Sequence, residues 1–130
     1  PALIAKAHLA KIKLESSIEI WGTGTPMREF LHVTDLADAL VHLLKNYSGP
    51  IHLNIGTGEE ISIRDLAQSV ADTVNFTGEL VFDTSKPDGA LRKLLDTDRL
   101  NQLGWGPSIN LRDGLQSTYE WYLENIFDSR

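Results

Sequence analysis

The sequence predicts an α/β fold with a few short strands and about five helices. Short alternating segments are separated by longer segments of helical period, Gly- and Pro-containing turns lie between them, and no segment is repeated. Such an order of single strands and helices is typical of the α/β class. Because only four strands are predicted, too few for a complete doubly wound sheet, the fold is either a small α/β domain or part of a larger sheet.

The composition is that of an ordinary folded chain. Hydrophobic residues make up 42% and charged residues 23% of the 130 residues, enough for one domain spanning residues 1–130. The net charge of −6 argues against a nucleic-acid partner. The absence of cysteine excludes disulfides and is typical of a reducing compartment. No apolar run approaches the roughly 20 residues of a membrane span, so we expect a cytoplasmic protein without a membrane partner.

The first predicted helix covers residues 3–14, where apolar side chains recur at helical spacing on Leu3, Ala7, Ala10 and Leu14. Residues 18–21 alternate as in a short strand, and the strand stops at the turn-rich residues 22–26.

The next predicted elements are an extended segment over Arg28–Val33, a helix and a strand. Thr34 is expected to cap that helix, which ends near Ser48. Residues 51–55 alternate between Pro50 and a glycine, which predicts a third strand.

The second half begins with a helix that Ser62 and Asp65 are expected to cap. Its apolar face is predicted to carry Ile63, Leu66, Ala67, Val70 and Val74. Residues 79–82 predict the fourth strand, and residues 84–91 a loop.

Two helices complete the prediction. A short one starts at Asp96 or Thr97 and is closed by Gly104, and a long one starts after the cap residue Asn110. The long helix is expected to reach about Ile126 and to bury Leu111, Leu115, Tyr119, Tyr122 and Ile126.

Neither Gly-Thr-Gly triplet, at residues 22–24 or 56–58, fits a dinucleotide fingerprint. That pattern needs a small residue three places after the second glycine, where this chain has Met27 and Ile61. Both triplets are therefore predicted to be turns with positive φ, and no cofactor-binding residue is predicted in this chain.

No catalytic residue or metal site is predicted either. The four histidines, His8, His32, His42 and His52, lie at no metal-ligand spacing. His32 and His52 are expected to be packed or hydrogen-bonded. The chain has no Gly-x-Ser-x-Gly and no Tyr-x-x-x-Lys sequence, and Tyr119 and Tyr122 are expected in the core or an interface.

A dispersed set of cations with one aromatic forms the candidate binding site. Trp21 ends a strand at a glycine turn, where its indole either lies on a base or sugar or fills the core. Arg28 is placed to bind a diphosphate in a bidentate manner, or to pair with Glu29 or Asp35 at the surface.

The second group of candidates, Asp88, Arg92 and Lys93, lies in or just after the loop 84–91. A carboxylate beside two cations suits a hydroxyl and a phosphate, although a solvated charge cluster has the same spacing.

The segment from Trp21 to Ala39, WGTGTPMREFLHVTDLADA, closely resembles the GDP-L-fucose synthases, a family of the extended short-chain dehydrogenase/reductase group. The resemblance continues through NIGTGE at 54–59, IRDLA at 63–67, FDTSKPDG at 82–89, RKLLD at 92–96, LGW at 103–105 and TYEWYLEN at 118–125. It covers the chain essentially end to end. The segment 28–35 is shared by many sugar-nucleotide epimerases and dehydratases, whereas WGTGTP combined with SKPDG is more particular.

The resemblance implies a C-terminal substrate-binding region, with the Rossmann core absent from this chain. Family members are NADPH-dependent 3,5-epimerase-4-reductases that act on GDP-4-keto-6-deoxy-D-mannose. Their N-terminal half binds NADP and carries the reacting side chains, so the chain is expected to be inactive alone. The family's contacts with the GDP-sugar fall on Lys6, Trp21, Arg28, Asp88 and Lys93, and relatives are typically homodimers.

Two departures from the family pattern affect this implied site. Lys6 stands where many relatives have Arg, so a point charge replaces a bidentate fork. Ala90 and Leu91 replace a more usual Thr-Pro ahead of Arg92. In the family, residues 51–55 would belong to the Rossmann sheet, and as an exposed edge they would pair with another copy.

Two alternatives remain from the sequence. One is the C-terminal part of another nucleotide-sugar epimerase or dehydratase. The other is a stand-alone nucleotide-sugar-binding module.

Overall fold

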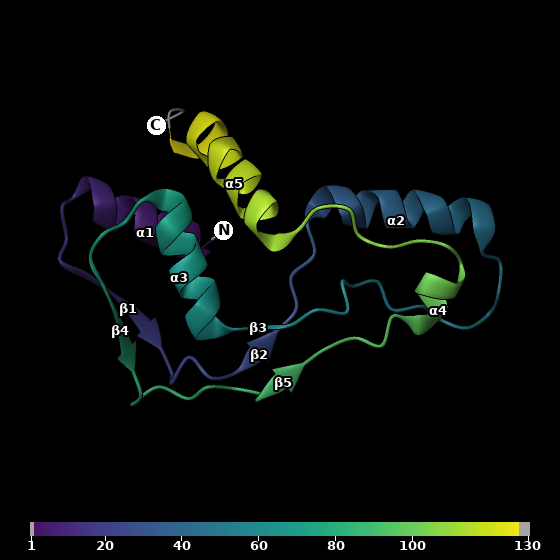
Figure 1. Ribbon diagram of the computed structural model, residues 1–130, viewed down its shortest axis with the longest axis horizontal. Helices are drawn as coiled ribbons and strands as arrows, with labels where there is room; N and C mark the ends of the chain where they lie inside the picture. Colours follow the sequence, from purple (N-terminus) through teal and green to yellow (C-terminus); the bar gives the residue numbers. More distant parts are fainter. Residues whose placement is uncertain (1, 128–130) are drawn as a thin grey trace.

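Five short strands form two small sheets in the computed structural model, which describes residues 2–127. In the first sheet β1 (Ser17–Trp21) lies parallel to β4 (Glu79–Asp83). In the second, β2 (Met27–Arg28) is central, antiparallel to β3 (Ile61–Ser62) and parallel to β5 (Arg92–Lys93). Because β1 and β4 run parallel, they end at the same edge of their sheet. The loops that follow them therefore lie together at one edge of the molecule (Figure 1).

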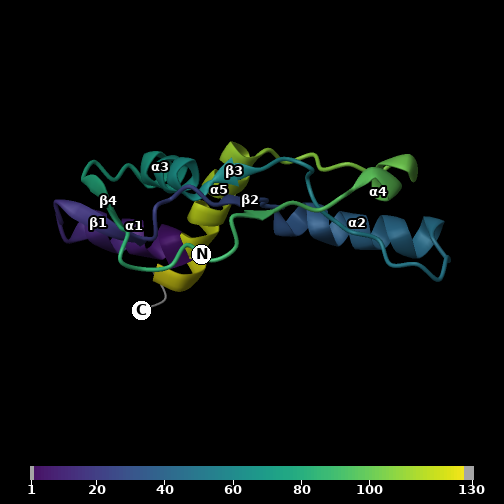
Figure 2. The same cartoon turned by 90° about the horizontal axis from the view of Figure 1, so that it is seen from below.

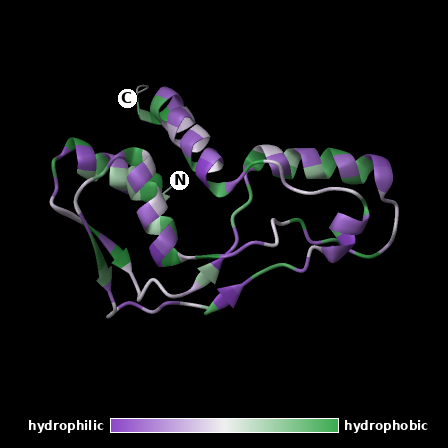
Figure 3. Ribbon diagram, in the orientation of Figure 1, coloured by the Kyte–Doolittle hydropathy of each residue, from purple (hydrophilic) through white to green (hydrophobic). Residues whose placement is uncertain are grey.

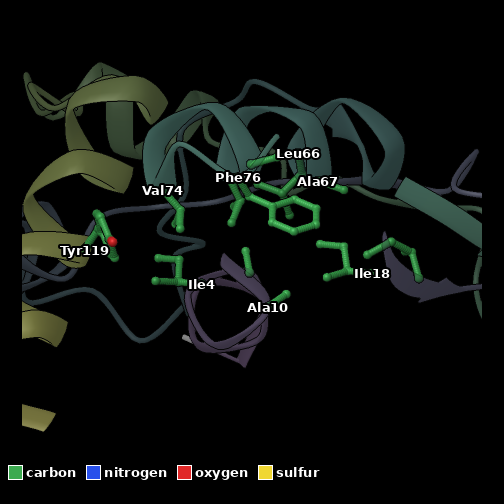
Figure 4. Close-up of a cluster of buried hydrophobic side chains, with 12 residues drawn as sticks. Ile4, Ala10, Ile18, Leu66, Ala67, Val74, Phe76 and Tyr119 are labelled. Carbon is green, nitrogen blue, oxygen red and sulfur yellow. The ribbon is translucent and has the colours of Figure 1, made fainter. Parts of the chain in front are cut away.

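The larger core lies at one end of this elongated molecule, between three helices and β1. These are α1 (Ala2–Ile12), α3 (Ile63–Val74) and α5 (Leu111–Tyr122). Side chains of α1 and α3 face one another across this core (Figure 4). Its buried residues are Ile4, Ala7, Ala10, Ile18, Ile20, Leu66, Ala67, Val70, Ala71, Val74, Phe76 and Tyr119. The predicted apolar face of α3 is therefore confirmed.

A smaller core lies at the other end, between α2 (Val33–Asn46) and α4 (Asp98–Gln102). Two views at right angles both place these helices far from α1 and α3 (Figures 1 and 2). Ala39, Leu100 and Trp105 are its buried members. The Trp105 indole N–H donates to Asp38 Oδ2 at 2.8 Å, so the buried ring satisfies its polar atom.

Asp35, at the start of α2, holds the chain that leads into α5. Its carboxylate accepts hydrogen bonds from Ser108 Oγ (2.8 Å), Ser108 N (3.2 Å) and Ile109 N (2.9 Å). Burial raises the pKa of Asp35, whereas these hydrogen bonds and the charge of His32 lower it. The lowering effects are the larger, so the pKa of Asp35 lies below its ordinary value. The ionised form is thus the one that the folded chain stabilises.

The predicted helix caps are confirmed at two helices. Ser62 Oγ accepts from Asp65 N (3.0 Å), and Asn110 Oδ1 accepts from Asp113 N (2.9 Å). The short helix follows Thr97, and Gly104 has the positive φ of 80° expected after its end.

Some details of the helices and strands differ from the prediction. The first helix ends at Ile12, and Leu14 is 89% exposed because its left-handed φ of 55° turns it away from the buried stripe. The extended segment shrinks to β2, and His32 caps α2 in place of Thr34, since its Nδ1 accepts from Thr34 N at 3.3 Å. The last helix does reach about Ile126 as predicted, because α5 continues as a π-helical turn, Leu123–Phe127, but Ile126 is exposed and not buried as expected.

The predicted strand at 51–55 is wrong for this structure. Residues 51–55 form no ladder with any described strand, and Ile51 and His52 are exposed. A strand requires a neighbour hydrogen-bonded through the backbone. The contacts of this segment are made through side chains instead, since Asn54 Nδ2 donates to Asp96 O at 3.0 Å and Ile55 packs against the smaller core. The alternating sequence therefore forms no strand within residues 2–127.

No helix among residues 2–127 is long and apolar enough to cross a membrane.

Replacement of Asp35 by Asn should lower the free energy of unfolding by about 1–2 kcal/mol at pH 7, because charge-assisted hydrogen bonds become neutral ones. A carboxyl whose pKa is depressed by folding contributes stability above its ordinary pKa of about 3.9 and loses it as the pH falls through the folded value. The difference between wild type and Asp35→Asn should thus shrink below about pH 4. Urea unfolding at several pH values measures it, and a pH-independent difference would contradict the assignment.

Candidate functional site

The centre of the candidate site is the glycine loop, residues 22–26, which connects β1 to β2. Gly22 and Gly24 have φ values of 87° and 77°, which confirms the predicted positive-φ turn. Gly22 N donates to Asp83 O of the neighbouring β4 at 2.9 Å. From the other side, the first amides of α3 donate to the loop, Ile63 N to Pro26 O (3.0 Å) and Arg64 N to Gly24 O (2.9 Å). The loop is therefore fixed between β4 and α3.

Asp88 fastens the same loop from the segment between β4 and β5. Its Oδ1 accepts from Thr23 N (2.7 Å) and its Oδ2 from Thr23 Oγ1 (2.8 Å). A side chain at Gly22 would overlap Asp88 Oδ1, so a glycine is needed there for close approach as well as for φ. The carboxylate thus has a structural function besides the substrate contact expected from the sequence.

The two cations Arg28 and Lys93 lie on neighbouring strands. The parallel register of β2 and β5 places Arg28 opposite Lys93 and Met27 opposite Arg92. Since successive residues of a strand point to opposite faces, Arg28 and Lys93 share one face. A Cβ on Gly89 would lie 3.9 Å from an Arg28 guanidinium nitrogen, so this cation lies beside the loop 84–91.

Arg92 faces the other way and is already paired. Its Nε donates to Glu60 Oε2 at 2.7 Å, and this hydrogen bond together with the carboxylate charge raises the pKa of Arg92. The structure does not group Arg92 with Arg28 and Lys93.

The ion pairs that the sequence offered as alternatives for Arg28 are not formed. Glu29 accepts from Gly58 N (2.6 Å) and Leu95 N (3.1 Å) instead, and Asp35 binds residues 108 and 109. Among the described contacts, the Arg28 guanidinium donates to Met27 O at 2.7 Å. Arg28 is thus half-buried and has no carboxylate partner within residues 2–127.

Trp21 and Lys6 lie together at the end of β1. Trp21 is 67% exposed, which excludes the core-filling alternative, and its Nε1 donates to Glu19 Oε1 at 3.2 Å. Lys6 of α1 donates to Glu19 O, and Lys6 and Trp21 line one shallow surface depression. Lys86 Nζ lies 5.7 Å from the centre of the Trp21 ring.

Sequence reasoning missed two contributors to this site, Lys86 and Arg64. Lys86 lies in the predicted SKPDG loop, so its position beside Trp21 could have been inferred once the two loops were expected to meet. Arg64 is an ordinary helix residue in the sequence and gives no signal there.

The histidines and tyrosines have structural contacts. His8 Nδ1 lies 2.9 Å from Tyr119 Oη in the larger core, where burial and then the nearby Tyr122 raise the pKa of Tyr119. His32 Nε2 lies 3.2 Å from Ser117 Oγ, so the prediction of a hydrogen-bonded His32 is confirmed. His52 is exposed, so it is not packed, which was one of the two positions expected for it. Residues 2–127 contain no group of acidic and histidine side chains that could hold a metal ion.

Residues 1–56 match the family described as "NAD dependent epimerase/dehydratase family". A protein of Arabidopsis thaliana named "Putative GDP-L-fucose synthase 2" is 52% identical over 130 residues, which are 100% of this chain and 40% of that protein.

Two solved structures are similar in fold and in sequence. The GDP-L-fucose synthetase of Naegleria fowleri bound to NADP has a TM-score of 0.90 and 32% identity, with 96% of this chain and 40% of that chain covered. The GDP-mannoheptose C4 reductase of Campylobacter jejuni with NADP bound has a TM-score of 0.82 and 42% identity, over 95% of this chain and 44% of that chain.

These matches first define the class: the chain has an α/β fold found in epimerase and reductase structures of the short-chain dehydrogenase/reductase type. Within that class, the chain is 52–54% identical to GDP-L-fucose synthases over 97–100% of its length and aligns with a portion of each. The chain spans about two fifths of the length of the curated relatives it matches.

Replacement of Gly24 by Ala should destabilise the chain more than the same change at Gly104. Both residues have positive φ, near 80°, but a Cβ at Gly24 would lie only 2.5 Å from Phe82 Cε1, whereas at Gly104 nothing lies within 4 Å. We expect Gly104→Ala to cost about 1–2 kcal/mol from φ alone and Gly24→Ala to cost about 1–3 kcal/mol more from steric displacement. Thermal and urea unfolding measure both, and equal costs would show that the Phe82 contact is unimportant.

Proposed function

We propose that this chain is the GDP-sugar-binding portion of an NADP-dependent epimerase-reductase that makes GDP-L-fucose from GDP-4-keto-6-deoxy-D-mannose. The observation that supports this most directly is the grouping of Arg28 and Lys93 on one sheet face beside the glycine loop, with the exposed Trp21 at the loop's other end. Two cations and an aromatic surface joined by one short loop suit a nucleoside diphosphate.

Each group has a distinct part in this proposal. Arg28 and Lys93 hold the pyrophosphate, the first through its planar fork and the second as a point charge. Trp21 provides a flat apolar surface for the base or a sugar ring, and Lys6 adds a cation at the same depression. Asp88 holds the loop and offers remaining carboxylate lone pairs to a hydroxyl. Arg92 pairs with Glu60 and is proposed to stabilise β5, without a contact to the phosphate.

Catalysis by this chain is then limited to orientation of the substrate. Fixing two reactants in a productive geometry lowers a barrier by about 7–11 kcal/mol in the most favourable intramolecular reactions. The residues that transfer the proton and the hydride belong, in this proposal, to the part of the protein outside the chain.

NADP is proposed to bind outside this chain as well, because the chain's glycine turns do not fit it. A dinucleotide pyrophosphate is bound by free amides at a helix N-terminus. The first amides of α3 already donate to Pro26 O and Gly24 O, and the Ser62 cap takes Asp65 N. The bound cofactor supplies the hydride. What this chain contributes is the position of the GDP-sugar.

The Rossmann core is proposed to cover the free face of α2. Apolar side chains of α2 are exposed along one side, with Val33 at 71% and Leu44 at 85%, and green apolar segments alternate with polar ones along this helix (Figure 3). The unpaired segment 51–55 follows α2 in the chain. Additional strands would cover the apolar face of α2. One of them would also pair with the segment 51–55. Such a full-length protein is further proposed to act as a homodimer.

A second candidate is a reductase for a different GDP-sugar. The similarity to the GDP-mannoheptose C4 reductase, at 42% identity, favours this alternative over one that uses another base. Arg28 and Lys93, which are proposed to bind the diphosphate, do not distinguish one sugar from another.

Titration of the chain with GDP, followed by tryptophan fluorescence, tests the proposed site. Trp21 and Trp121 are exposed while Trp105 is buried, and Trp21 lies in the proposed site. Saturable quenching by GDP is therefore expected, with weak binding of UDP and none of NADP⁺. Equal binding of GDP and UDP would favour a nucleotide-sugar enzyme of different base preference. Loss of the quenching in Trp21→Phe with retained binding by calorimetry would confirm the source of the signal. No binding of GDP would contradict a site contained in this chain.

In the full-length protein, Arg28→Ala should raise the KM for the GDP-sugar by about tenfold or more, the equivalent of at least 1.4 kcal/mol, with little effect on the KM for NADPH. Arg92→Ala is the matched control, because that neighbouring arginine faces Glu60. Steady-state kinetics with each substrate varied in turn measures both. An unchanged KM for the GDP-sugar in Arg28→Ala would remove this residue from the site.

A further inference from the structure

Arg64, the second residue of α3, joins the glycine loop to two other elements. Its side chain donates to Thr23 O at 2.8 Å, and its backbone N–H donates to Gly24 O at 2.9 Å. The guanidinium carbon lies 3.8 Å from the centre of the Phe82 ring of β4. A planar cation at this distance stacks on the ring. One residue thus connects the loop, the helix and the first sheet.

The loop held in this way separates the two groups proposed to recognise opposite ends of a nucleoside diphosphate. Trp21 immediately precedes the loop 22–26, and Arg28 is the second residue after it. Any change in the path of this loop changes the distance and angle between the indole and the guanidinium. The Thr23 peptide is bound on both sides, because its N–H donates to Asp88 and its carbonyl accepts from Arg64.

We propose that Arg64 is a positioning residue that sets the relative placement of Trp21 and Arg28 through the glycine loop. The inference rests on the proposed nucleotide-binding function for its consequence in binding, but its structural part is independent of any ligand. Arg64 acts by holding Thr23 O and covering Phe82, not by touching the nucleotide.

The chemistry of the contact requires arginine. A lysine at residue 64 retains the positive charge and one donor, but an ammonium cannot lie flat on Phe82 while it donates to Thr23 O. A methionine retains much of the apolar stem and loses both polar contacts. The pair of variants Arg64→Lys and Arg64→Met therefore separates the charge from the planar geometry.

Arg112 provides a matched control. It is the second residue of α5, as Arg64 is of α3, and it is likewise exposed. Within residues 2–127 its side chain forms no ion pair or side-chain hydrogen bond. Arg112→Met thus reproduces the loss of a cation from the first turn of a helix without disturbing the glycine loop.

The first experiment uses no ligand. Amide hydrogen exchange of the chain by NMR should show the Gly22 and Thr23 amides exchanging about tenfold faster in Arg64→Met, with a smaller increase in Arg64→Lys. The Trp21 indole signal and the Arg28 Nε signal should shift. Amides in the centre of α3, such as Val70, should be unchanged in both variants. Exchange at Gly22 and Thr23 within twofold of wild type in Arg64→Met, or the same change in Arg112→Met, would overturn the proposal.

The second experiment compares GDP with its parts, guanosine and inorganic pyrophosphate. If Arg64 only aligns two subsites, Arg64→Met weakens GDP at least fivefold while guanosine and pyrophosphate each change less than twofold. A direct phosphate contact would weaken pyrophosphate as much as GDP, and unchanged GDP affinity would show that alignment is unimportant, so either result contradicts the proposal. Failure of the wild type to bind GDP would count against the proposed function, whereas the exchange experiment would still decide the structural inference.

Discussion

The hydrogen bonds that fix the glycine loop are the constraint on which the candidate site depends. Residues 22–26 are held by Asp88 on one side and by the first turn of α3 on the other, so the exposed Trp21 and the cation Arg28 have fixed positions at its two ends. Glycines with positive φ make this path possible, and Phe82 and Asp88 fill the space that a side chain on the loop would need. A rigid loop loses less conformational entropy on binding than a mobile one. The chain therefore holds its charged and aromatic groups in place before a ligand arrives.

Two carboxylates, Glu29 and Asp35, fix the backbone between the two cores. Glu29 accepts backbone N–H groups from Gly58 and Leu95, which come from segments on either side of β2. Asp35 fixes residues 108 and 109 at the entrance to α5. In an elongated molecule whose apolar cores lie at opposite ends, these acceptors hold the central segment together where little apolar surface is buried. The cations of the site are consequently not neutralised by Glu29 or Asp35, although both lie close to Arg28 in the sequence.

Much of the fold could be predicted from the sequence, because apolar period and capping residues are local signals. The face of α3, the caps at Ser62 and Asn110 and the turns at Gly22 and Gly24 follow from such signals. The strand expected at 51–55 could not be judged in this way, since strand formation depends on a partner that local sequence does not reveal. For the site, spacing brought out Trp21, Arg28 and Lys93, and their function as substrate contacts stays a prediction. Sequence spacing could not show that Arg92 and Lys93 point to opposite faces, because the register of β5 with β2 decides this. It could not indicate Arg64 either, because that residue's function depends on a contact with Thr23, which is distant in the sequence.

The central claim is that a nucleoside diphosphate binds across the glycine loop, between Trp21 and the face shared by Arg28 and Lys93. Chemical-shift mapping of the ¹⁵N-labelled chain during addition of GDP tests it most directly. The claim predicts saturable shifts at the Trp21 indole, at Arg28 and Lys93 and at the backbone of Gly89, with α2 unaffected. Shifts confined to other parts of the chain, such as α2 or the segment 51–55, or no shifts at all, would contradict it.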